Sequence, residues 1–467
     1  MHKPLAAALT ALGLAACSTA GPDYHPPVTS VATAPGATDS FLSATGPTID
    51  PTRPLPDRWW RLYADPTLDA LVEQALAANA DLRVADANLT RAQAVLREAE
   101  AARTITTTVN GGVTVARQSG TGLPLPGTVN DNVSVAAGYP LDINGRIRRA
   151  IEASTADTQS IEAARDEVRV SVAASTARAY GEVCAANYLL NVNRRVVALQ
   201  RDTLDATRRL FRGGRGTAFD VTRAEAAVET SEAALPVFEG RRQAGLYLLA
   251  ALLGRPPADY PRDIAECAAL PALTRPLPTG DGAALIRRRP DIRQAERSLA
   301  ADTARIGVAM ADLYPQINIG GSIGLSGPLK DLGSGTSFGF SLGPLLSWSF
   351  PNRPVVRARI AQAEAQVQAD LAAFDGTVLE ALRQTETALE TYRRDAQRAE
   401  ALAKASTSSR RAADQADRLF RFGRGDFLAL LDAQRSYATA EAASAAARTQ
   451  LLQDQIAVFL SLGGGWS

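Results

Sequence analysis

Histidine is almost absent from this sequence: the 467 residues include two, His2 and His25. His2 lies in an N-terminal segment that we expect to be removed, so the mature chain can assemble neither a Ser-His-Asp triad nor a histidine metal site. The chain also lacks a Walker-type glycine loop and a Cys-x-x-Cys pair. We therefore predict that the protein is not an enzyme and has no catalytic residue, no metal and no cofactor.

An excess of charge of either sign is missing as well. Lys and Arg number 50 against 49 Asp and Glu, which gives a formal net charge of +1. A nucleic-acid-binding protein needs a basic surface that neutralises phosphates. The balance of charges therefore argues against a nucleic-acid partner.

The predicted mature chain has no run of 18 or more apolar residues, so we expect no helix that crosses a bilayer. At the N-terminus Lys3 precedes an apolar run over residues 5–16, as in a bacterial export signal. Residues 14–17, Leu-Ala-Ala-Cys, resemble a lipobox, which predicts cleavage before Cys17 and attachment of lipid to it. Ser18 at the next position resembles the outer-membrane sorting pattern. An ordinary signal peptide with a chance cysteine is the alternative.

Two other cysteines remain, Cys184 in a helical pattern and Cys267 in a loop. An exported protein can form a disulfide, so the sequence leaves their pairing open. We expect each to be a lone buried cysteine.

One short phrase occurs twice in the chain. Residues 209–216 read Arg-Leu-Phe-Arg-Gly-Gly-Arg-Gly and residues 418–425 read Arg-Leu-Phe-Arg-Phe-Gly-Arg-Gly, so seven of the eight positions are identical. Each copy separates two long helical patterns, and its glycines supply the positive φ that ends a helix. We interpret each phrase as the tip of a helical hairpin in a tandem duplication.

The duplication organises the whole chain. We predict a signal peptide at residues 1–16, a lipidated N-terminus with an extended, proline-rich leader at 17–66, a first repeat at 67–254, a connector at 255–282 and a second repeat at 283–467. The apolar spacing predicts helices over 68–103, 146–210, 219–253, 283–313, 355–422 and 427–462, with Thr67 as the N-cap of the first.

Four short segments alternate with a period of two: residues 105–115, 133–139, 317–325 and 338–343. One face of each is apolar, and the other carries Gly, Ser, Thr, Asn or Ala. This alternation is typical of a strand with lipid on one side and water on the other. A strand of a soluble sandwich would alternate similarly, and the export signal favours the membrane.

Four strands cannot close a barrel, and lipid does not tolerate an open sheet edge, so several chains must contribute. Two chains would give a filled eight-stranded barrel, whereas three give twelve strands and a lumen. We therefore predict a mainly α protein with a membrane β part: a homotrimeric 12-stranded β-barrel continued by a coiled-coil tunnel. The long helices, about 65 residues each, would extend that tunnel roughly 100 Å into the periplasm.

A tube that is open at its periplasmic end would leak, so we expect a gate near the tips. Leu428 and Asp432 are four residues apart and share one helix face just after the second tip. Phe219 and Arg223 stand at the equivalent positions of the first copy, so the two tips are not interchangeable. Spacing alone also allows Leu428 in a coiled-coil core and Asp432 as a solvated or salt-bridged residue.

Several motifs together resemble the outer membrane factor family, the TolC-like trimeric ducts, and especially its lipoprotein branch of efflux channels. They are the lipobox with Gly21-Pro22-Asp23-Tyr24, Trp60 with Asp65-Pro66 and Leu68, Arg288-Arg289-Pro290-Asp291-Ile292 with Ala295-Glu296, Phe422-Gly423 through Leu431-Asp432-Ala433-Gln434-Arg435, and Leu462-Gly463-Gly464-Gly465-Trp466. The chain departs from the family where Ile105 stands in place of the second copy's Pro315, and where residues 139–142 lack the usual tryptophan.

The resemblance implies a passive exit duct in the bacterial outer membrane, in contact with its lipid, that docks through a periplasmic adaptor to an inner-membrane pump. In that branch a Leu and an Asp four residues later form the constriction, which assigns the periplasmic gate to Leu428 and Asp432. Adaptor contact is assigned to Arg212, Gly213, Gly214, Arg215, Gly216, Arg421, Phe422, Gly423, Arg424 and Gly425. The alternatives are a protein-secretion duct of the same fold and a lipid-anchored periplasmic coiled coil without a pore.

Overall fold

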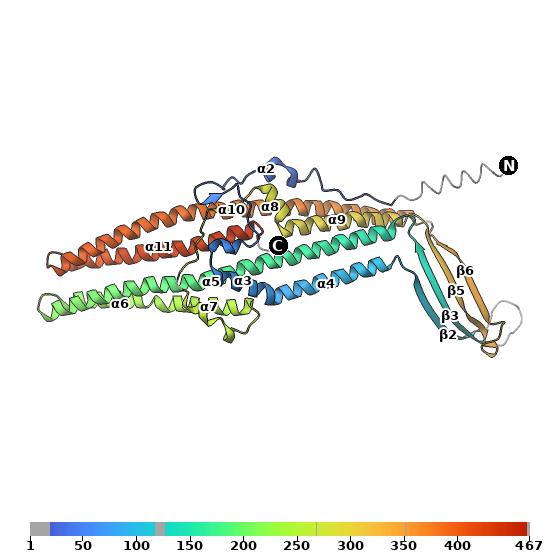
Figure 1. Cartoon of the computed structure of the whole chain (residues 1–467), viewed down its shortest axis with the longest axis horizontal. Helices are drawn as coiled ribbons and strands as arrows, with labels where there is room; N and C mark the ends of the chain where they lie inside the picture. The colour runs from blue at the N-terminus through green and yellow to red at the C-terminus, as the bar shows by residue number, and fades with distance from the viewer. Residues whose placement is uncertain (1–18, 117–126, 268, 351, 465–467) are drawn as a thin grey trace. The chain divides into compact units, whose positions relative to one another are not determined.

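The computed structural model describes residues 19–116, 127–267, 269–350 and 352–464. The predicted signal peptide at 1–16, Cys17, Ser18, Gly465 and Trp466 lie outside these ranges. The chain divides into two compact units. Unit 1 comprises Met1–Val28, Asn88–Glu162 and Gln294–Phe374, and unit 2 comprises Thr29–Ala87, Ala163–Arg293 and Asp375–Ser467. Figure 1 shows the elements of both units.

Unit 1 contains the four predicted strands, and the structure confirms all of them. They form one antiparallel sheet in the order β2 (Thr106–Ala116), β3 (Thr128–Leu141), β5 (Gln316–Pro328) and β6 (Phe338–Ser347). β3 is longer than predicted, because pairing with two neighbours extends it to both sides of the alternating segment.

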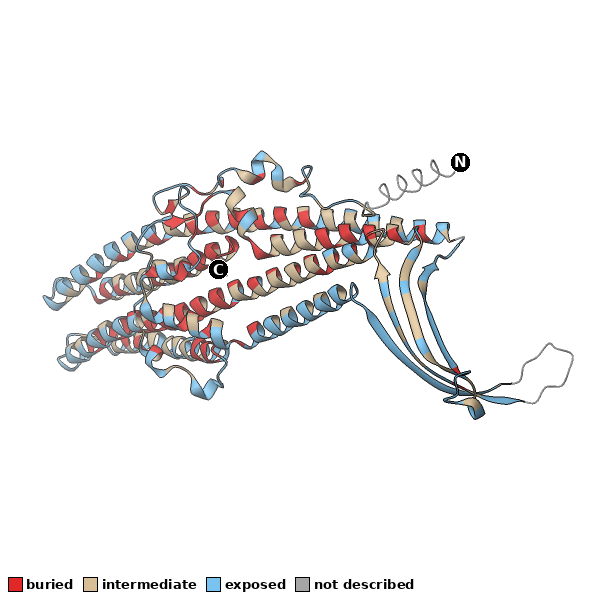
Figure 2. Cartoon of the chain, turned by 45° about the vertical axis from the view of Figure 1, so that its right-hand side comes forward, coloured by how far each residue is buried: buried red, intermediate tan, exposed pale blue. Residues whose placement is uncertain are grey.

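The register of the sheet sorts the side chains onto two faces. Val135 pairs with Ile323, and Ile323 pairs with Phe340, so these apolar residues share one face. On the other face the hydroxyls of Ser322 and Ser341 lie 2.9 Å apart. In a single chain β2 and β6 are exposed along almost their whole length, whereas β3 alternates between exposed and half-buried residues and β5 is mostly half-buried (Figure 2).

The first described residues are fixed to unit 1. The backbone N–H of Ala20 donates to the carbonyl of Asn144, which follows β3. The buried guanidinium of Arg149 donates to the carbonyls of Ala20 and Gly21 and to the carboxylate of Asp23, at 3.0, 3.1 and 2.7 Å. The chain is therefore anchored beside the end of a strand immediately after the predicted lipobox.

Two long helices carry the chain from the strands into unit 2. α5 (Arg146–Arg212) has 67 residues and α10 (Arg353–Arg421) has 69. The returning helices are α6 (Ala218–Glu232) with α7 (Leu235–Leu252), and α11 (Phe427–Ser461). Over the described residues, no helix combines the length and the apolar character needed to cross a bilayer.

Three predicted helices are interrupted. The predicted helix 68–103 is two helices, α3 (Pro66–Ala78) and α4 (Ala80–Ala101), which are separated by the buried Asn79. The side chain of Asn79 caps α4 and donates to the carbonyl of Leu252 at 3.2 Å. Pro290 separates α8 (Gly282–Arg288) from α9 (Pro290–Ala311), and Pro236 lies in the first turn of α7. The N-cap of α3 is Asp65 and not Thr67, because the Asp65 carboxylate accepts two backbone N–H groups.

The proline-rich leader packs against unit 2 through short elements. These are η1 (Val31–Thr33), α2 (Pro35–Thr38), β1 (Ile49–Asp50), which pairs in parallel with β4 (Leu277–Pro278), and η2 (Trp59–Tyr63). The carboxylate of Glu386 on α10 accepts the backbone N–H groups of Leu42 and Ser43 at 2.6 and 3.0 Å. The ring of Trp59 stacks on Phe459 with centroids 4.6 Å apart. The remaining short helices are η3 (Pro257–Asp259), η4 (Arg262–Glu266) and η5 (Leu329–Asp331).

The expectation of two lone cysteines is wrong. Cys184 on α5 and Cys267 after η4 form a disulfide across a sequence separation of 83 residues. The side-chain amide of Asn187, one turn from Cys184, donates to the carbonyls of Ala265 and Cys267, both at 2.7 Å. The connector is therefore tied to α5 by a covalent bond and two hydrogen bonds.

Candidate functional site at the hairpin tips

The two repeated phrases form the same turn, as predicted. α5 ends at Arg212, Gly214 has φ 71°, and the N–H of Arg215 donates to the Leu210 carbonyl at 2.9 Å. In the second copy Gly423 has φ 71°, and the N–H of Arg424 donates to the Leu419 carbonyl, also at 2.9 Å. A glycine in the left-handed conformation and this long backbone bond end both helices by one mechanism.

The helices that follow the two turns begin differently. Thr217 and Asp220 form a capping box at the start of α6, because each side chain accepts the backbone N–H of the other residue. Asp426 holds the equivalent position before α11, and its side chain makes no capping bond. The first turn of α11 therefore depends on packing for its position.

That packing comes from Phe427, which is 8% exposed. It lies in an apolar cluster with Leu204 of α5 and with Ala224 and Val228 of α6. The ring of Phe420, at the end of α10, lies 5.7 Å from that of Phe427. Both hairpins of unit 2 thus meet at this cluster.

A polar contact further along α11 joins this helix to α5. Gln434 of α11 is 2% exposed and donates to the hydroxyl of Thr203 on α5 at 2.7 Å. Sequence reasoning quoted Gln434 within a motif but gave it no role. Its position seven residues after Phe427 places both on the core-facing side of α11, which was the available signal.

The structure places Leu428 and Asp432 together on the exposed side of α11. Leu428 is 48% exposed, and Asp432 and Arg435 are exposed beyond it on the same side. No ion pair of Asp432 is formed among the described residues. The prediction that Leu428 and Asp432 share one helix face is confirmed. The alternative, that Leu428 is buried in a coiled-coil core, does not hold within a single chain, because Leu428 is exposed.

At the equivalent positions of the first copy, Phe219 and Arg223 contact each other. The guanidinium carbon of Arg223 lies 5.6 Å from the centroid of the Phe219 ring, in a cation–π contact. Phe219 is 67% exposed, so this pair lies on the surface of α6. At the first tip, Phe219 and Arg223 therefore contact each other. At the second tip, the exposed Leu428 and Asp432 are available to contact another surface.

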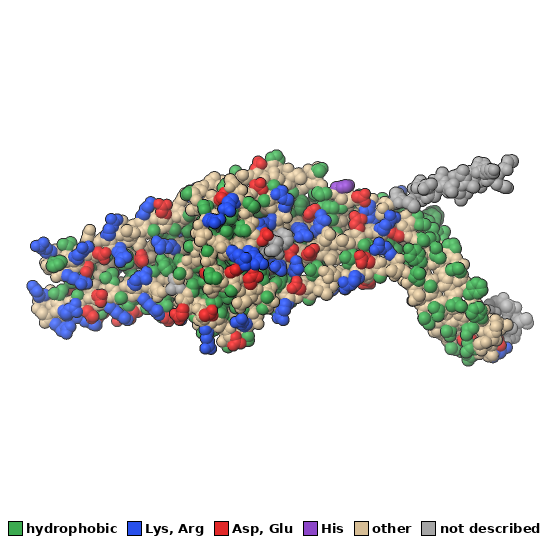
Figure 3. Space-filling model, in the orientation of Figure 1, with side chains coloured by type: hydrophobic (Ala, Val, Ile, Leu, Met, Phe, Trp, Pro, Cys, Tyr) green, Lys and Arg blue, Asp and Glu red, His purple; other side chains and the backbone are tan. Residues whose placement is uncertain are grey.

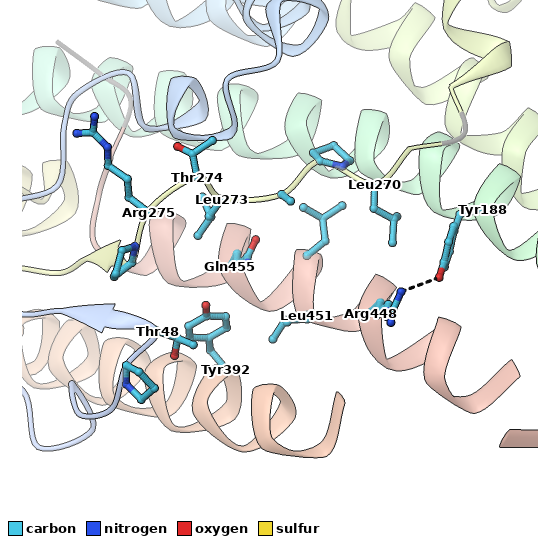
Figure 4. A pocket seen from close by; sticks show the side chains of 15 residues that line it. Thr48, Tyr188, Leu270, Leu273, Thr274, Arg275, Tyr392, Arg448, Leu451 and Gln455 are labelled. Carbon is cyan, nitrogen blue, oxygen red and sulfur yellow. Dashed lines mark hydrogen bonds between the residues drawn. The ribbon is translucent and has the colours of Figure 1, made fainter. Parts of the chain in front are cut away.

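A cavity of about 600 Å³ lies elsewhere in unit 2, between residues 270–276 of the connector and helices α5, α10 and α11. Figure 4 shows Arg448 directed toward the Tyr188 hydroxyl, to which it donates at 3.3 Å, and Arg275 directed away. Among the described residues, its lining combines leucines and prolines with a few polar side chains and no carboxylate.

No group of three or more His, Cys, Asp or Glu side chains is arranged to hold a metal ion in the part of the chain that the structure describes.

Comparison with known proteins agrees with the architecture of paired strands and long hairpins. The profile of the family described as "Outer membrane efflux protein" matches residues 71–255 and 283–464. The chain therefore belongs to the outer membrane efflux protein family. Members of this family are channels of the bacterial outer membrane and not enzymes, and this chain is an outer-membrane efflux channel protein.

Individual relatives align over nearly the whole chain. A solved structure of the outer-membrane channel OprN has a TM-score of 0.88 at 35% identity and covers 96% of this chain and 100% of that one. Nodulation protein T of Rhizobium leguminosarum bv. viciae is 30% identical, over 100% of this chain and 95% of the relative. The antibiotic efflux pump outer membrane protein ArpC of Pseudomonas putida is 29% identical, over 99% and 95%.

Proposed function

We propose that the protein is the exit duct of a tripartite efflux system. It passively conducts small toxic compounds or drugs from the periplasm to the exterior, in complex with a periplasmic adaptor and an inner-membrane pump. The observation that carries this proposal is a four-stranded sheet with one apolar face, attached to two long helical hairpins. The relative named as an antibiotic efflux pump component supports the substrate class.

The sheet supports a homotrimer. β2 and β6 are the outer strands of the order β2-β3-β5-β6, so each offers one edge to another chain. An unpaired edge in lipid leaves backbone donors and acceptors without partners. Three copies joined edge to edge give a closed 12-stranded β-barrel with a lumen, and the two predicted repeats, 67–254 and 283–467, would each supply two of its strands per chain.

Lipid attachment to Cys17 belongs to the same proposal. The contacts of Arg149 and Asn144 with Ala20, Gly21 and Asp23 fix the chain beside the end of β3. A strand that spans the outer membrane ends at the membrane surface. An acyl chain on Cys17 would therefore enter the leaflet next to the strands, and mass spectrometry of the purified protein tests whether the mature N-terminus carries it.

The gate is proposed at Leu428 and Asp432. Both lie on the exposed face of α11, whose first turn has no side-chain cap and is held by Phe427. In a trimer the three copies of this face would form a ring of apolar and acidic side chains around the axis. The turn residues 212–216 and 421–425 would contact the adaptor, because they form the ends of both hairpins.

Native mass spectrometry and planar-bilayer recording of the wild-type protein test the duct directly. We expect trimers that insert and give a small, stable single-channel conductance, since a closed gate restricts flow. Well-folded protein that forms no trimers and no channels would contradict the duct and favour the lipid-anchored coiled coil.

A further inference from the structure

We propose that the two tips bind an acidic surface: the partner protein that docks on them presents carboxylates, interleaved with apolar side chains, to the arginines of both turns. This inference rests on the proposed docking of a periplasmic adaptor and adds the chemistry by which the partner is recognised.

Arginines gather at both hairpin ends, and five of them lack a carboxylate partner. Arg208 pairs with Glu225 at 2.7 Å, and Arg421 pairs with Asp417 at 2.9 Å. Five further exposed arginines form no ion pair among the described residues: Arg209, Arg212, Arg215, Arg418 and Arg424. Figure 3 shows these ends as groups of basic side chains. An external surface that carries negative charge would complement these five unpaired arginines.

Helix stabilisation explains only part of this set. Arg209, Arg212 and Arg418 lie in the last turns of α5 and α10, where a cation interacts favourably with the helix dipole. The side chains of Arg212 and Arg418 also donate to backbone carbonyls one turn back, at 3.4 and 3.2 Å. These contacts leave most of the guanidinium donors unused.

Arg215 and Arg424 lie beyond the helix ends and need another explanation. They occupy the same position of the two turns, and their backbone N–H groups close those turns. Closing the turn requires only the backbone, so any residue other than proline would serve. Their side chains are exposed and unpaired, which makes them the clearest evidence for an external partner.

Exposed apolar side chains lie among these charges. Phe422 is 79% exposed, Leu419 50% and Phe211 46%. A purely ionic contact, for example with free anions, would not require them. A protein surface that combines carboxylates with apolar residues satisfies both features, and the planar guanidinium group suits bidentate contact with carboxylates.

The two tips present their charges as one surface. The apolar cluster around Phe427 and the bond from Gln434 to Thr203 hold α11 against α5 and α6 within unit 2. A partner can therefore contact both turns at once, which gives the contact the affinity of two linked sites.

The test places the photo-crosslinking residue p-benzoylphenylalanine at Phe422 of the full-length protein, produced in its own host. Illumination of intact cells captures what contacts the tip, and mass spectrometry identifies the captured segment. The yield is normalised to the amount of folded trimer. The charge-reversal variant is Arg209→Glu/Arg215→Glu/Arg424→Glu, and its matched control, Arg83→Glu/Arg91→Glu/Arg97→Glu, makes the same change of charge at exposed positions of α4.

We expect a captured protein segment in which carboxylates outnumber basic residues. The crosslink yield should fall about tenfold or more in the tip variant and change little in the control, because juxtaposed like charges oppose docking. Replacing the captured carboxylates with arginine should restore the yield in the tip variant, which a merely structural role of the tip arginines would not do.

Capture of a neutral or basic segment, or of phospholipid, would overturn the acidic-partner inference while leaving the channel itself unaffected. An unchanged yield in the tip variant would do the same. If folded trimers capture nothing at the tip, docking at this surface is wrong, and the inference fails with it.

Discussion

The two hairpins of unit 2 share one repeated sequence pattern, but different interactions stabilise them. Hairpin 1 is α5 with α6 and α7, and hairpin 2 is α10 with α11. Ion pairs at heptad spacing join the two sides of hairpin 1: Arg194–Glu239 at 3.3 Å, Arg201–Glu232 at 2.5 Å and Arg208–Glu225 at 2.7 Å. Two further features stabilise hairpin 1: the capping box at Thr217 fixes the start of α6, and the Cys184–Cys267 disulfide ties α5 to the connector.

Hairpin 2 has no ion pair between α10 and α11 among the described residues. The hydroxyl of Ser406 on α10 donates to the carboxylate of Glu441 on α11. Further along the same helices, Asp395 and Asp454 form a contact that is unfavourable when both are ionised. Burial first, and then a carboxyl–carboxylate hydrogen bond with Asp395 and the negative charge of Asp395, raise the pKa of Asp454 to about 6, against a hydrogen bond from Gln450. When both groups are ionised, one buried carboxylate oxygen of Asp454 has no hydrogen-bond donor among the described residues. Such a contact loosens the helix pair when both groups are ionised.

From this difference we expect hairpin 1 to be rigid and hairpin 2 to be adaptable. The residues proposed as the gate, Leu428 and Asp432, lie on the adaptable one. Their first-copy equivalents, Phe219 and Arg223, are engaged with each other. Movement of α11 against a braced hairpin 1 is therefore the motion that we expect to open the duct.

The largest loss should come from removing the brace unique to hairpin 1. Cys184→Ser/Cys267→Ser frees a loop that spans 83 residues of separation, and the entropy released in the unfolded chain should cost about 4 kcal/mol. Thermal denaturation of oxidised wild type and variant measures it. A dithiothreitol-treated wild type should match the variant, and a variant as stable as the oxidised protein would show that hairpin 1 is not braced here.

The next effect concerns the packing that positions hairpin 2. Phe427→Ala removes a buried ring from the cluster shared by both hairpins and should destabilise the protein by about 3 kcal/mol. Phe219→Ala removes an exposed ring from tip 1 and should change stability by about 0.5 kcal/mol or less. Chemical denaturation midpoints compare the two, and equal losses would remove this distinction between the tips.

The acidic contact of hairpin 2 predicts a pH dependence. The folded pKa of Asp454, about 6, exceeds its ordinary value of 3.8, so the folded state holds a proton that the unfolded state releases, and stability falls as pH rises between these values. Asp454→Asn should therefore stabilise the protein at pH 8 by on the order of 1 kcal/mol, after allowance for solvent screening. The gain should vanish near pH 4.

The control for this prediction is Asp414→Asn, which changes an exposed carboxylate on α10. Melting temperatures measured from pH 4 to pH 8 should show a pH-dependent difference for Asp454→Asn and none for the control. A pH-independent gain in both variants would mean that the carboxyl contact does not loosen hairpin 2.

The smallest change in stability is expected from removing one of the three ion pairs that join the helices of hairpin 1. Arg201→Ala breaks its contact with Glu232 at a largely exposed site and should cost about 0.5 kcal/mol. High salt should shrink the difference between wild type and variant. A salt-independent loss would assign the effect to packing of the arginine stem and not to its charge.

Local features of the sequence predicted much of this structure. The turns at Gly214 and Gly423 followed from a glycine pattern, and the strands followed from their alternation, because both depend on neighbouring residues. The break at Asn79 depends on the distant Leu252 carbonyl, and the disulfide depends on the approach of Cys184 and Cys267. Composition and periodicity carry no signal for such contacts.

The candidate site divides in the same way. The shared face of Leu428 and Asp432 was predictable from their spacing on one helix. The missing cap at Asp426, the pairing of Arg223 with Phe219 and the burial of Gln434 needed the folded chain. The gate itself requires three chains, so it stays a prediction.

Single-channel conductance in planar bilayers tests whether hairpin 2, and not hairpin 1, closes the duct. The recordings compare wild type, Leu428→Ala/Asp432→Ala and the matched variant Phe219→Ala/Arg223→Ala. We expect a small conductance for wild type and for the hairpin 1 variant, and a sharp rise for the hairpin 2 variant. An unchanged conductance in Leu428→Ala/Asp432→Ala, or an equal rise in both variants, would contradict the account.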